Sequence, residues 1–374
     1  MGKARDRRRI PMSALDTSSA GPQALLSPRM VQSTVLPVIR QQVSALEPTL
    51  ARICSYHLCF TDEHGAPSSV QGGKLTRAAL MTAAADGVGL RPEDVRCQAA
   101  ALELLHNSTL LHDDIIDADE LRRGRPAAWT VFGAGPAILA GDALQALGLR
   151  MVVDDPGPGR ADISAAFAEA LALVLAGQAR ELTVRLGSAD GTAEHDGTAE
   201  HDRVAEYDRI VEEKTSALLQ CALVTPALRA GGPGHVLTAL RGAGRHLGLA
   251  FQILNDVEDI WGDPRVTGKP VRSDILRRNP SFPVLAALST DTPAGDRLRR
   301  LWHADVTTGP HLQEMADLVE ESGGRHTAEQ RSRSHLHTAL EHLGRAGLSP
   351  AASTELAALF DRIVHRGAGS RPTT

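Results

Sequence analysis

The sequence predicts an all-helical protein folded as one large antiparallel helical bundle, and two observations carry this prediction. Aromatic residues make up only 3% of the 374 residues. Ala- and Leu-rich stretches recur with the 3.6-residue spacing of helices, whereas alternating β-branched segments are nearly absent. With 42% hydrophobic and 23% charged residues, the composition is that of an ordinary globular protein with enough apolar residues for a sizeable core.

The two ends of the chain differ in composition from its middle. Residues 1–25 and 366–374 are polar and rich in Gly, Pro and Ser, so we expect disordered tails around a helical domain at 26–365. Turn-forming residues predict loops at 62–73, 154–160, 187–202 and 262–270. The third loop contains a tandem GTAEHD hexapeptide. Its His and Asp residues could bind metal, but a short polar duplication is more often neutral, and we assign no site there.

Charge and cysteine usage exclude several classes of protein. A net charge of −5 gives no general attraction to nucleic acid or anionic lipid. The cysteines follow neither a zinc pattern nor a dense disulfide pattern, which is typical of a reducing cytoplasm. The basic N-terminus is not followed by an apolar run, and no stretch of about 18 apolar residues occurs, so we expect neither secretion nor stable membrane insertion.

The strongest motif is an acidic cluster in an otherwise apolar segment that begins at Gln98. At about 100° per residue, His106, Thr109, Asp113 and Asp117 share one face of a helix. Like charges one turn apart destabilise a helix unless a cation is bound nearby. Carboxylate oxygens without sulfur ligands favour a hard ion such as Mg²⁺.

A second acidic helix follows far downstream. One face of it carries five oxygen-bearing side chains: Gln252, Asn255, Asp256, Asp259 and Asp263. If the two faces oppose each other across a bundle, several metal ions could hold one diphosphate from both sides. An isolated acidic cluster is more often a solvated helix end. Here each cluster interrupts an apolar helix and is followed by a basic turn, which favours metal and phosphate binding.

These motifs belong to a longer ordered series. The series comprises GGKxxR at 72–77, QxxxxELLH ending at His106, DDIID at 113–117, LRRGRPA at 121–127, AGDAL at 140–144, GQ at 177, KT at 214, FQxxxD at 251–256 and GDPxVTGKPxxSD at 262–274. From about Gly72 to Leu343 the chain resembles the trans-polyprenyl diphosphate synthase family. The resemblance implies the isoprenoid synthase fold, a helical bundle around a central cavity, and usually a homodimer. It also implies an enzyme that condenses isopentenyl diphosphate with the allylic diphosphates dimethylallyl, geranyl or farnesyl diphosphate.

The resemblance also assigns roles to individual residues. The implied ligands of three Mg²⁺ ions, for which Mn²⁺ is an alternative, are Asp113, Asp114, Asp117, Asn255, Asp256 and Asp259. The implied contacts to isopentenyl diphosphate are Lys74, Arg77, His106 and Arg123. Arg122 and Lys269 would face the allylic diphosphate. The residues beside the reacting carbons would be Lys214, Thr215 and Gln252.

Two departures from the family pattern keep other functions open. Asn255 stands where the family usually has Asp. Asn279 and Pro280 stand where it usually has two lysines, unless Arg277 or Arg278 supplies the missing cation. Asn255, Asp259 and Asp263 resemble the spacing of the metal triad of class I terpene cyclases, which share the fold. A weakly active partner subunit of a heteromeric synthase is a third hypothesis. The residues expected to bind isopentenyl diphosphate favour the synthase.

Product length depends on the residues beneath the catalytic centre. Thr109 lies one turn before Asp113, where a growing chain would extend, and both Thr109 and the adjacent Ser108 are small. An aromatic residue there would stop growth early, so the sequence predicts geranylgeranyl diphosphate as the main product. Met81 is a candidate for the deeper floor of the cavity.

Overall fold

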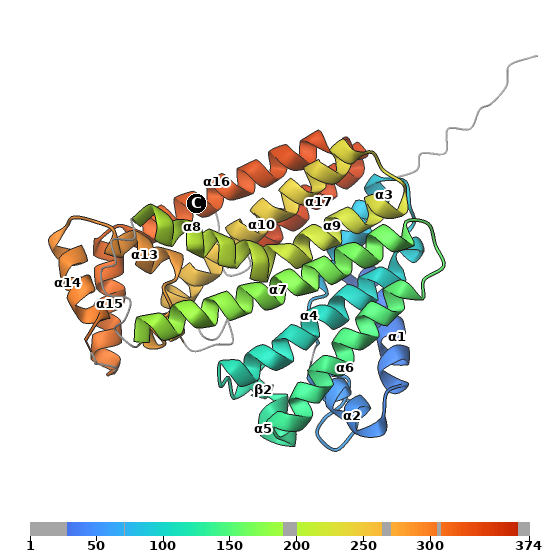
Figure 1. The fold of residues 1–374 in the computed structure, drawn as a ribbon, viewed down its shortest axis with the longest axis horizontal. Helices are drawn as coiled ribbons and strands as arrows, with labels where there is room; N and C mark the ends of the chain where they lie inside the picture. Colours follow the sequence, from blue (N-terminus) through green and yellow to red (C-terminus); the bar gives the residue numbers. More distant parts are fainter. Residues whose placement is uncertain (1–27, 71, 190–199, 264–270, 305–307, 366–374) are drawn as a thin grey trace, which may run out of the picture.

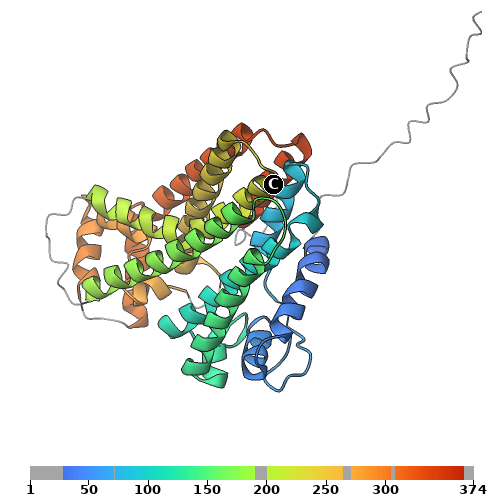
Figure 2. The same ribbon diagram turned by 45° about the vertical axis from the view of Figure 1, so that its right-hand side comes forward.

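The computed structural model describes residues 28–70, 72–189, 200–263, 271–304 and 308–365. The two predicted tails, Lys269 and most of the GTAEHD duplication lie outside these residues, and the predicted domain boundaries remain predictions. Figures 1 and 2 show a bundle of long helices with a smaller helical group at one end. The prediction of an all-helical fold is confirmed.

The first half of the chain supplies three long helices of the bundle, α4, α6 and α7. Its elements are α1 (Pro28–Ser44), α2 (Pro48–His57), α3 (Thr76–Gly87), η1 (Pro92–Asp94), α4 (Arg96–Ile116), β1 (Leu121–Arg122), β2 (Arg125–Pro126), α5 (Ala128–Phe132), α6 (Ala134–Val153) and α7 (Arg160–Ala189).

The second half contributes the helices that face α4 and α7, and then the end group. Its elements are α8 (Glu200–Val211), η2 (Glu212–Ser216), α9 (Ala217–Arg229), α10 (Gly234–Trp261), α12 (Ser273–Leu276), α13 (Phe282–Leu288), α14 (Pro293–Trp302), α15 (Gly309–Glu321), α16 (Gly324–Arg345) and α17 (Pro350–Val364). Several of these helices have proline at their first or second position, which suits the first turn because it needs no backbone N–H donor there.

Among the described residues, one large apolar core runs through the bundle, a smaller one lies in the end group, and a third joins α8, α10, α13 and α16. The large core joins α1, α3, α4, α6, α7, α9, α10, α16 and α17, and includes the fully buried Phe167 and Phe360. The smaller core is built around Leu298, Trp302 and Val319 of α14 and α15. In Figure 1 the helices α13, α14 and α15 lie together at the left end of the bundle. On α10, Leu249 and Ile253 are buried, as expected from their position off the acidic face.

Two helices are more apolar than the rest. The windows Ala134–Val153 in α6 and Arg160–Arg185 in α7 are long and apolar enough to cross a membrane by length and composition alone, and 44% of each is buried inside the fold. Core helices of soluble proteins pass the same test, so this is weak evidence for a membrane span.

The only described strands form a tight hairpin directly after α4. Leu121 pairs with Pro126, and Arg122 pairs with Arg125. The two turn residues, Arg123 and Gly124, have φ of +56° and +74°, the conformation that two-residue hairpins require. Because the turn is this tight, Arg122 and Arg123 stay beside the C-terminal end of α4.

A π-helical turn, η2, is held between α7 and α10 by close backbone contacts. A Cβ on Gly177 of α7 would lie 2.6 Å from the backbone nitrogen of Lys214, and one on Gly248 of α10 would lie 2.1 Å from Oγ of Ser216. Such π-turns are frequent at functional sites because they re-aim side chains. Glycine on both neighbouring helices fixes where Lys214 and Thr215 point.

Replacing Gly177 with alanine should therefore destabilise the protein. The added methyl group would push η2 away from α7, and we expect the free energy of unfolding to fall by about 1–3 kcal/mol. Gly344→Ala is the matched control, because nothing lies within 4 Å of its Cβ position on α16, and it should leave stability unchanged or raise it by roughly 0.5 kcal/mol. Chemical denaturation measures both. Equal stability of the two variants would contradict this packing.

Candidate active site

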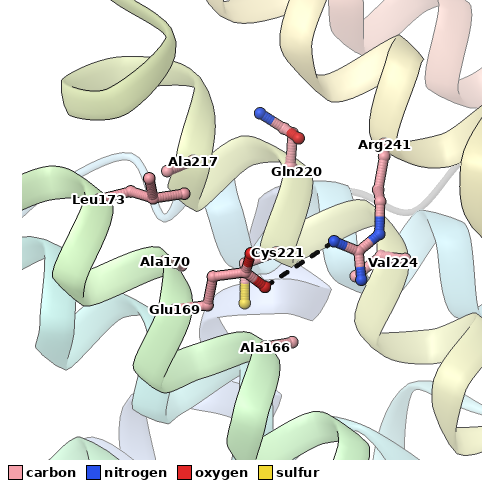
Figure 3. Close-up of a pocket in the computed structure, with 9 residues that line it drawn as sticks. All are labelled: Ala166, Glu169, Ala170, Leu173, Ala217, Gln220, Cys221, Val224 and Arg241. Carbon is pink, nitrogen blue, oxygen red and sulfur yellow. Dashed lines mark ion pairs between the residues drawn. The ribbon is translucent and has the colours of Figure 1, made fainter. Parts of the chain in front are cut away.

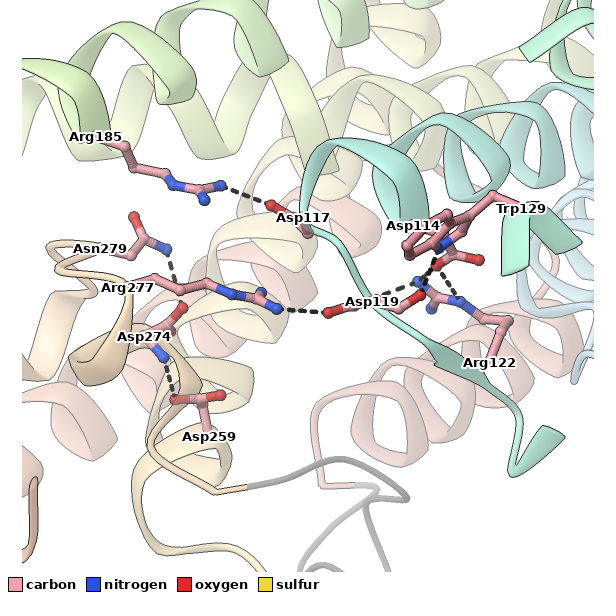
Figure 4. Close-up of polar contacts among 10 residues, drawn as sticks. All are labelled: Asp114, Asp117, Asp119, Arg122, Trp129, Arg185, Asp259, Asp274, Arg277 and Asn279. Atoms are coloured by element: carbon pink, nitrogen blue, oxygen red, sulfur yellow. Dashed lines mark hydrogen bonds and ion pairs between the residues drawn. The ribbon is translucent and has the colours of Figure 1, made fainter. Parts of the chain in front are cut away.

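Three carboxylates of the first acidic cluster lie at the C-terminal end of α4. Asp114 is buried and accepts a hydrogen bond of 2.7 Å from Nε of Arg122 in the hairpin. Asp117, the residue that caps α4, accepts a 2.6 Å bond from Nη1 of Arg185 on α7. Figure 4 shows both pairs at the end of α4. The cluster is thus an ion-paired group between helices and not a solvated helix end.

Asp113 faces the π-helical turn. Burial raises the pKa of its carboxyl to about 6, opposed by Lys214 and reinforced by the nearby carboxylates of Asp117 and Glu181. The ammonium group of Lys214 forms an ion pair with Glu181 of α7. Lys214 is therefore a cation shared among acids on α4 and α7.

Thr215, the next residue, links the π-turn to the second acidic helix. Its hydroxyl donates to Oε1 of Gln252 over 3.1 Å, and Nε2 of Gln252 donates to Oδ1 of Asp256 over 2.9 Å. Lys214 and Thr215 are neighbours in the chain, and one faces Asp113 while the other reaches Gln252. The structure therefore brings both acidic helices to the same end of the bundle.

Asp256, on the second acidic helix, accepts hydrogen bonds from three groups. Its Oδ2 accepts hydrogen bonds from the hydroxyl of Tyr207, at 2.7 Å, and from the backbone N–H of Phe282, at 3.0 Å. Burial, followed by the charge of Asp274, raises the pKa of Asp256 to about 8 despite these donors. Such a buried carboxyl favours a nearby cation, since positive charge would offset its desolvation.

Residues 274–279, which follow α10 in the chain, add further polar contacts to the site. Oδ2 of Asp259 accepts a bond from the backbone N–H of Asp274 at 2.9 Å, and Nδ2 of Asn279 donates to Oδ1 of Asp274 at 3.0 Å. Arg277 then reaches across and donates to Oδ1 of Asp119 at 2.6 Å. Figure 4 shows Arg277 extending to Asp119, which lies just past the end of α4.

Basic side chains gather beside the hairpin. The pKa of His106 is lowered well below its usual value by burial and then by Arg77, Arg123 and Arg122. His57, which is buried, is affected in the same way by burial and the hairpin arginines. Arg123 is held by 2.9 Å bonds to the carbonyl oxygen of His57 and to Oδ1 of Asn107. Neutral histidines among arginines form a pocket of positive charge that suits a second phosphate group.

The remaining predicted residues are placed as follows. Lys74 is exposed in the segment before α3, and the preceding Gly73 packs so closely on Arg123 that its Cβ would lie 3.2 Å from Nη2. Asn255 is half-buried on α10 beside Asp256. Thr109 is half-buried on α4, with its hydroxyl bonded to the carbonyl oxygen of His106 at 2.8 Å. Lys269 lies outside the described residues.

The donor set fits a hard divalent cation in chemistry, because it consists of carboxylate oxygens. Among the described residues, no three His, Cys, Asp or Glu side chains converge closely enough to hold a metal ion by themselves. Mg²⁺ usually takes one or two carboxylates and completes its shell with water and substrate phosphate oxygens. The arrangement suits ions that arrive with a phosphorylated substrate.

A small pocket lies elsewhere on α7, α9 and α10 and has different chemistry (Figure 3). Its lining residues are Ala166, Glu169, Ala170, Leu173, Ala217, Gln220, Cys221, Val224 and Arg241. The Cys221 thiol is buried, and burial raises its pKa to about 12, which disfavours the thiolate form. None of the predicted site residues lines this pocket.

Several residues of the site were missed by sequence reasoning. Glu181 follows the GQ motif by one helical turn, and Asp274 ends the last quoted motif, so both could have been found from their spacing. Tyr207 and Arg185 carry no such signal. They reach the site only because α8 packs on α10 and α7 passes the end of α4.

Comparison with known proteins agrees with this geometry. A family model described as polyprenyl synthetase matches residues 65–319. The (2E,6E)-farnesyl diphosphate synthase of Mycobacterium tuberculosis is 36% identical over 344 residues, covering 91% of this chain and 92% of its own. A geranylgeranyl diphosphate synthase of the same organism is 36% identical over 337 residues, covering 88% and 90%. The crystal structure of a polyprenyl synthetase from Streptomyces coelicolor A3(2) superposes with a TM-score of 0.80 at 33% identity, covering 90% of this chain and 98% of that one.

The fold and the paired acidic segments define an isoprenoid synthase of the all-helical class. The chain belongs to the polyprenyl synthetase family. Membership implies dependence on a divalent metal and the use of isopentenyl and allylic diphosphates as substrates.

The variant Tyr207→Phe tests whether the hydrogen bond from Tyr207 to Asp256 of α10 supports metal binding. Removing the hydroxyl takes one of three hydrogen-bond donors from Asp256 and lets its carboxylate turn. We expect the Mg²⁺ concentration for half-maximal turnover to rise about tenfold, as for other outer-shell partners of metal ligands. A Mg²⁺ titration of the reaction rate measures this, with thermal unfolding to check the fold. An unchanged Mg²⁺ requirement would show that Asp256 does not depend on Tyr207.

Proposed function

We propose that this protein is a Mg²⁺-dependent prenyltransferase that condenses isopentenyl diphosphate with allylic diphosphates into a linear trans-prenyl diphosphate. The supporting observation is the convergence of two distant acidic segments and a basic pocket at one end of the helical bundle. Acids on both sides suit an allylic diphosphate with its metal ions. The separate pocket around His106 suits the diphosphate of isopentenyl diphosphate.

The chain's own residues have distinct tasks in this reaction. Bound divalent ions, taken as three Mg²⁺, would neutralise charge on the phosphate oxygens. Arg122 and Lys269 would face the allylic diphosphate, with Lys214 beside the reacting carbons, so the carbon–oxygen bond breaks and pyrophosphate leaves with the electron pair. Arg77, Arg123 and His106 hold the second substrate, and Lys74 reaches its diphosphate from the exposed segment.

Carbon–carbon bond formation follows between two positioned substrates. The double bond of isopentenyl diphosphate attacks the allylic cation, and the proton it loses goes to the released pyrophosphate. Thr215 and Gln252 fix the wall beside the reacting carbons through their 3.1 Å hydrogen bond. Most of the protein's contribution is positioning and charge stabilisation.

Two observations favour the synthase over the cyclase and the partner subunit. The relatives reported above are named as synthases of linear diphosphates, and the cyclase and the inactive subunit gain no support from them. A cyclase needs no site for isopentenyl diphosphate, yet Arg77, His106 and Arg123 cluster as such a site requires.

Incubation with Mg²⁺, labelled isopentenyl diphosphate and each allylic primer tests the function. We expect longer linear diphosphates from the chain alone. Asp114→Asn removes the carboxylate that anchors Arg122 and should lower kcat by about 100-fold or more. A hydrocarbon made from geranylgeranyl diphosphate alone would indicate a cyclase instead. Turnover only with an added second protein would indicate a partner subunit.

Thr109 tests the product length. We propose geranylgeranyl diphosphate as the main product, because the half-buried Thr109 and the buried Ser108 are both small. Thr109→Phe places a ring one turn below Asp113 and should shift the product toward farnesyl diphosphate or shorter chains. Chromatography of the dephosphorylated products measures the shift. An unchanged distribution would show that the growing chain does not pass Thr109.

We also propose that the protein acts as a homodimer in the cytoplasm. The two long apolar helices α6 and α7 expose large apolar side chains. These are Ile138, Leu139 and Val153 on α6, and Leu173 and Leu175 on α7. A second copy of the same face would cover them without a membrane.

A further inference from the structure

Two arginines outside the quoted motifs point at the first acidic cluster from opposite walls. Arg185 extends from α7 to Oδ1 of Asp117, and Arg277, directly after α12, extends to Oδ1 of Asp119, both at 2.6 Å. Figure 4 shows both guanidinium groups directed at the end of α4. The side chains of Arg185 and Arg277 are only 19% and 32% exposed, so neither is an ordinary surface charge.

Both arginines are paired with carboxylates at or just after the end of α4. Arg185 bonds to Asp117 and Arg277 bonds to Asp119, and the carboxylates of Asp117 and Asp274 also lie close enough to Arg277 to affect its charge. Burial disfavours the charge of Arg277, yet the carboxylates of Asp119, Asp117 and Asp274 outweigh it and raise its pKa. When divalent ions take the oxygens of Asp117, Arg185 loses its partner beside the phosphate groups, and phosphate oxygens can then compete with Asp119 for the Arg277 guanidinium. Its planar array of N–H donors matches phosphate oxygens as well as carboxylate oxygens.

The neighbouring sequence explains why the chain would need extra cations. Asn279, in a position where lysine is usual, donates to Oδ1 of Asp274 instead, and Pro280 has no side-chain donor. Arg278 turns away, donating to the carbonyl oxygen of Ala304 at 2.8 Å and lying over the ring of Trp302. Of the two arginines after α12, Arg277 is the one that faces the acidic cluster.

We propose that Arg185 and Arg277 are diphosphate-binding residues of this chain, held by Asp117 and Asp119 until a metal-bound diphosphate arrives and then transferred to its oxygens. This inference rests on the proposed function and deepens it. It adds two contacts to the pyrophosphate leaving group, one from α7 and one from the segment after α12, on opposite sides of the substrate.

Binding of inorganic pyrophosphate in the presence of Mg²⁺, measured by calorimetry, tests the assignment. Arg185→Gln and Arg277→Gln should each weaken pyrophosphate affinity about tenfold, and Arg185→Lys should recover part of the loss because the charge remains. The control is Arg180→Gln, which removes another ion-paired arginine of α7 that contacts Glu206 and Glu213. It should bind pyrophosphate as the wild type does. Thermal unfolding of each variant confirms that it is folded.

A second titration, with Mg²⁺ alone, separates this role from a purely structural one. Arg185→Gln removes the guanidinium group that bonds to Asp117. The affinity of the protein for Mg²⁺ should therefore stay the same or increase. A parallel loss of Mg²⁺ affinity would mean that the arginines only position the aspartates, and would overturn the proposal. So would unchanged pyrophosphate affinity in the double variant while the wild type makes prenyl diphosphates. A wild-type chain that neither binds pyrophosphate nor condenses the substrates would refute the proposed function itself.

Discussion

Ion pairing between the acids at the end of α4 and cations supplied by separate elements is the interaction on which the site depends. Asp114, Asp117 and Asp119 each hold an arginine from a different element: the hairpin, α7 and the segment after α12. Burying so many carboxylates together costs free energy unless positive charge is nearby. The arginines supply that charge in this structure, and divalent ions bound at the same carboxylates would supply it in the proposed reaction.

The bundle makes this arrangement possible through backbone geometry at a few places. The hairpin turn at Arg123 and Gly124 keeps two arginines at the end of α4. The π-turn fits between Gly177 and Gly248 and aims Lys214 and Thr215 at opposite helices. The π-turn matters for the site because its side chains contact both acidic helices: Lys214 lies near Asp113 of α4, and Thr215 bonds to Gln252 of α10. Most of the remaining helices build the apolar core behind them.

Helical class and the two acidic faces could be predicted from the sequence because both depend on local periodicity. The burial of Leu249 and Ile253, away from the acidic face of α10, follows from the same 3.6-residue repeat. The pairing of Arg185 with Asp117 could not be predicted, since it depends on how α7 crosses α4. Tyr207 reaches Asp256 for a similar reason, through the packing of α8 on α10. Arg277 and Arg278 were equal candidates in the sequence, and tertiary packing distinguishes them.

Relatives named as farnesyl and as geranylgeranyl diphosphate synthases are equally similar to the chain at 36% identity. Overall similarity therefore does not select a product, and the side chains below the acidic cluster must do so. The departures at Asn255, Asn279 and Pro280 change the charge of the site without changing its framework. Arginines on neighbouring elements offer a physical reason why such a site could still hold pyrophosphate.

A crystal structure with Mn²⁺ and pyrophosphate would show whether both acidic helices bind the ions, because anomalous scattering locates each ion. We predict ions on both sides of one pyrophosphate, some bound by Asp113 or Asp117 of α4 and at least one by Asp256 or Asp259 of α10. Ions bound by α4 alone, with the α10 acids turned away from the pyrophosphate, would contradict this prediction.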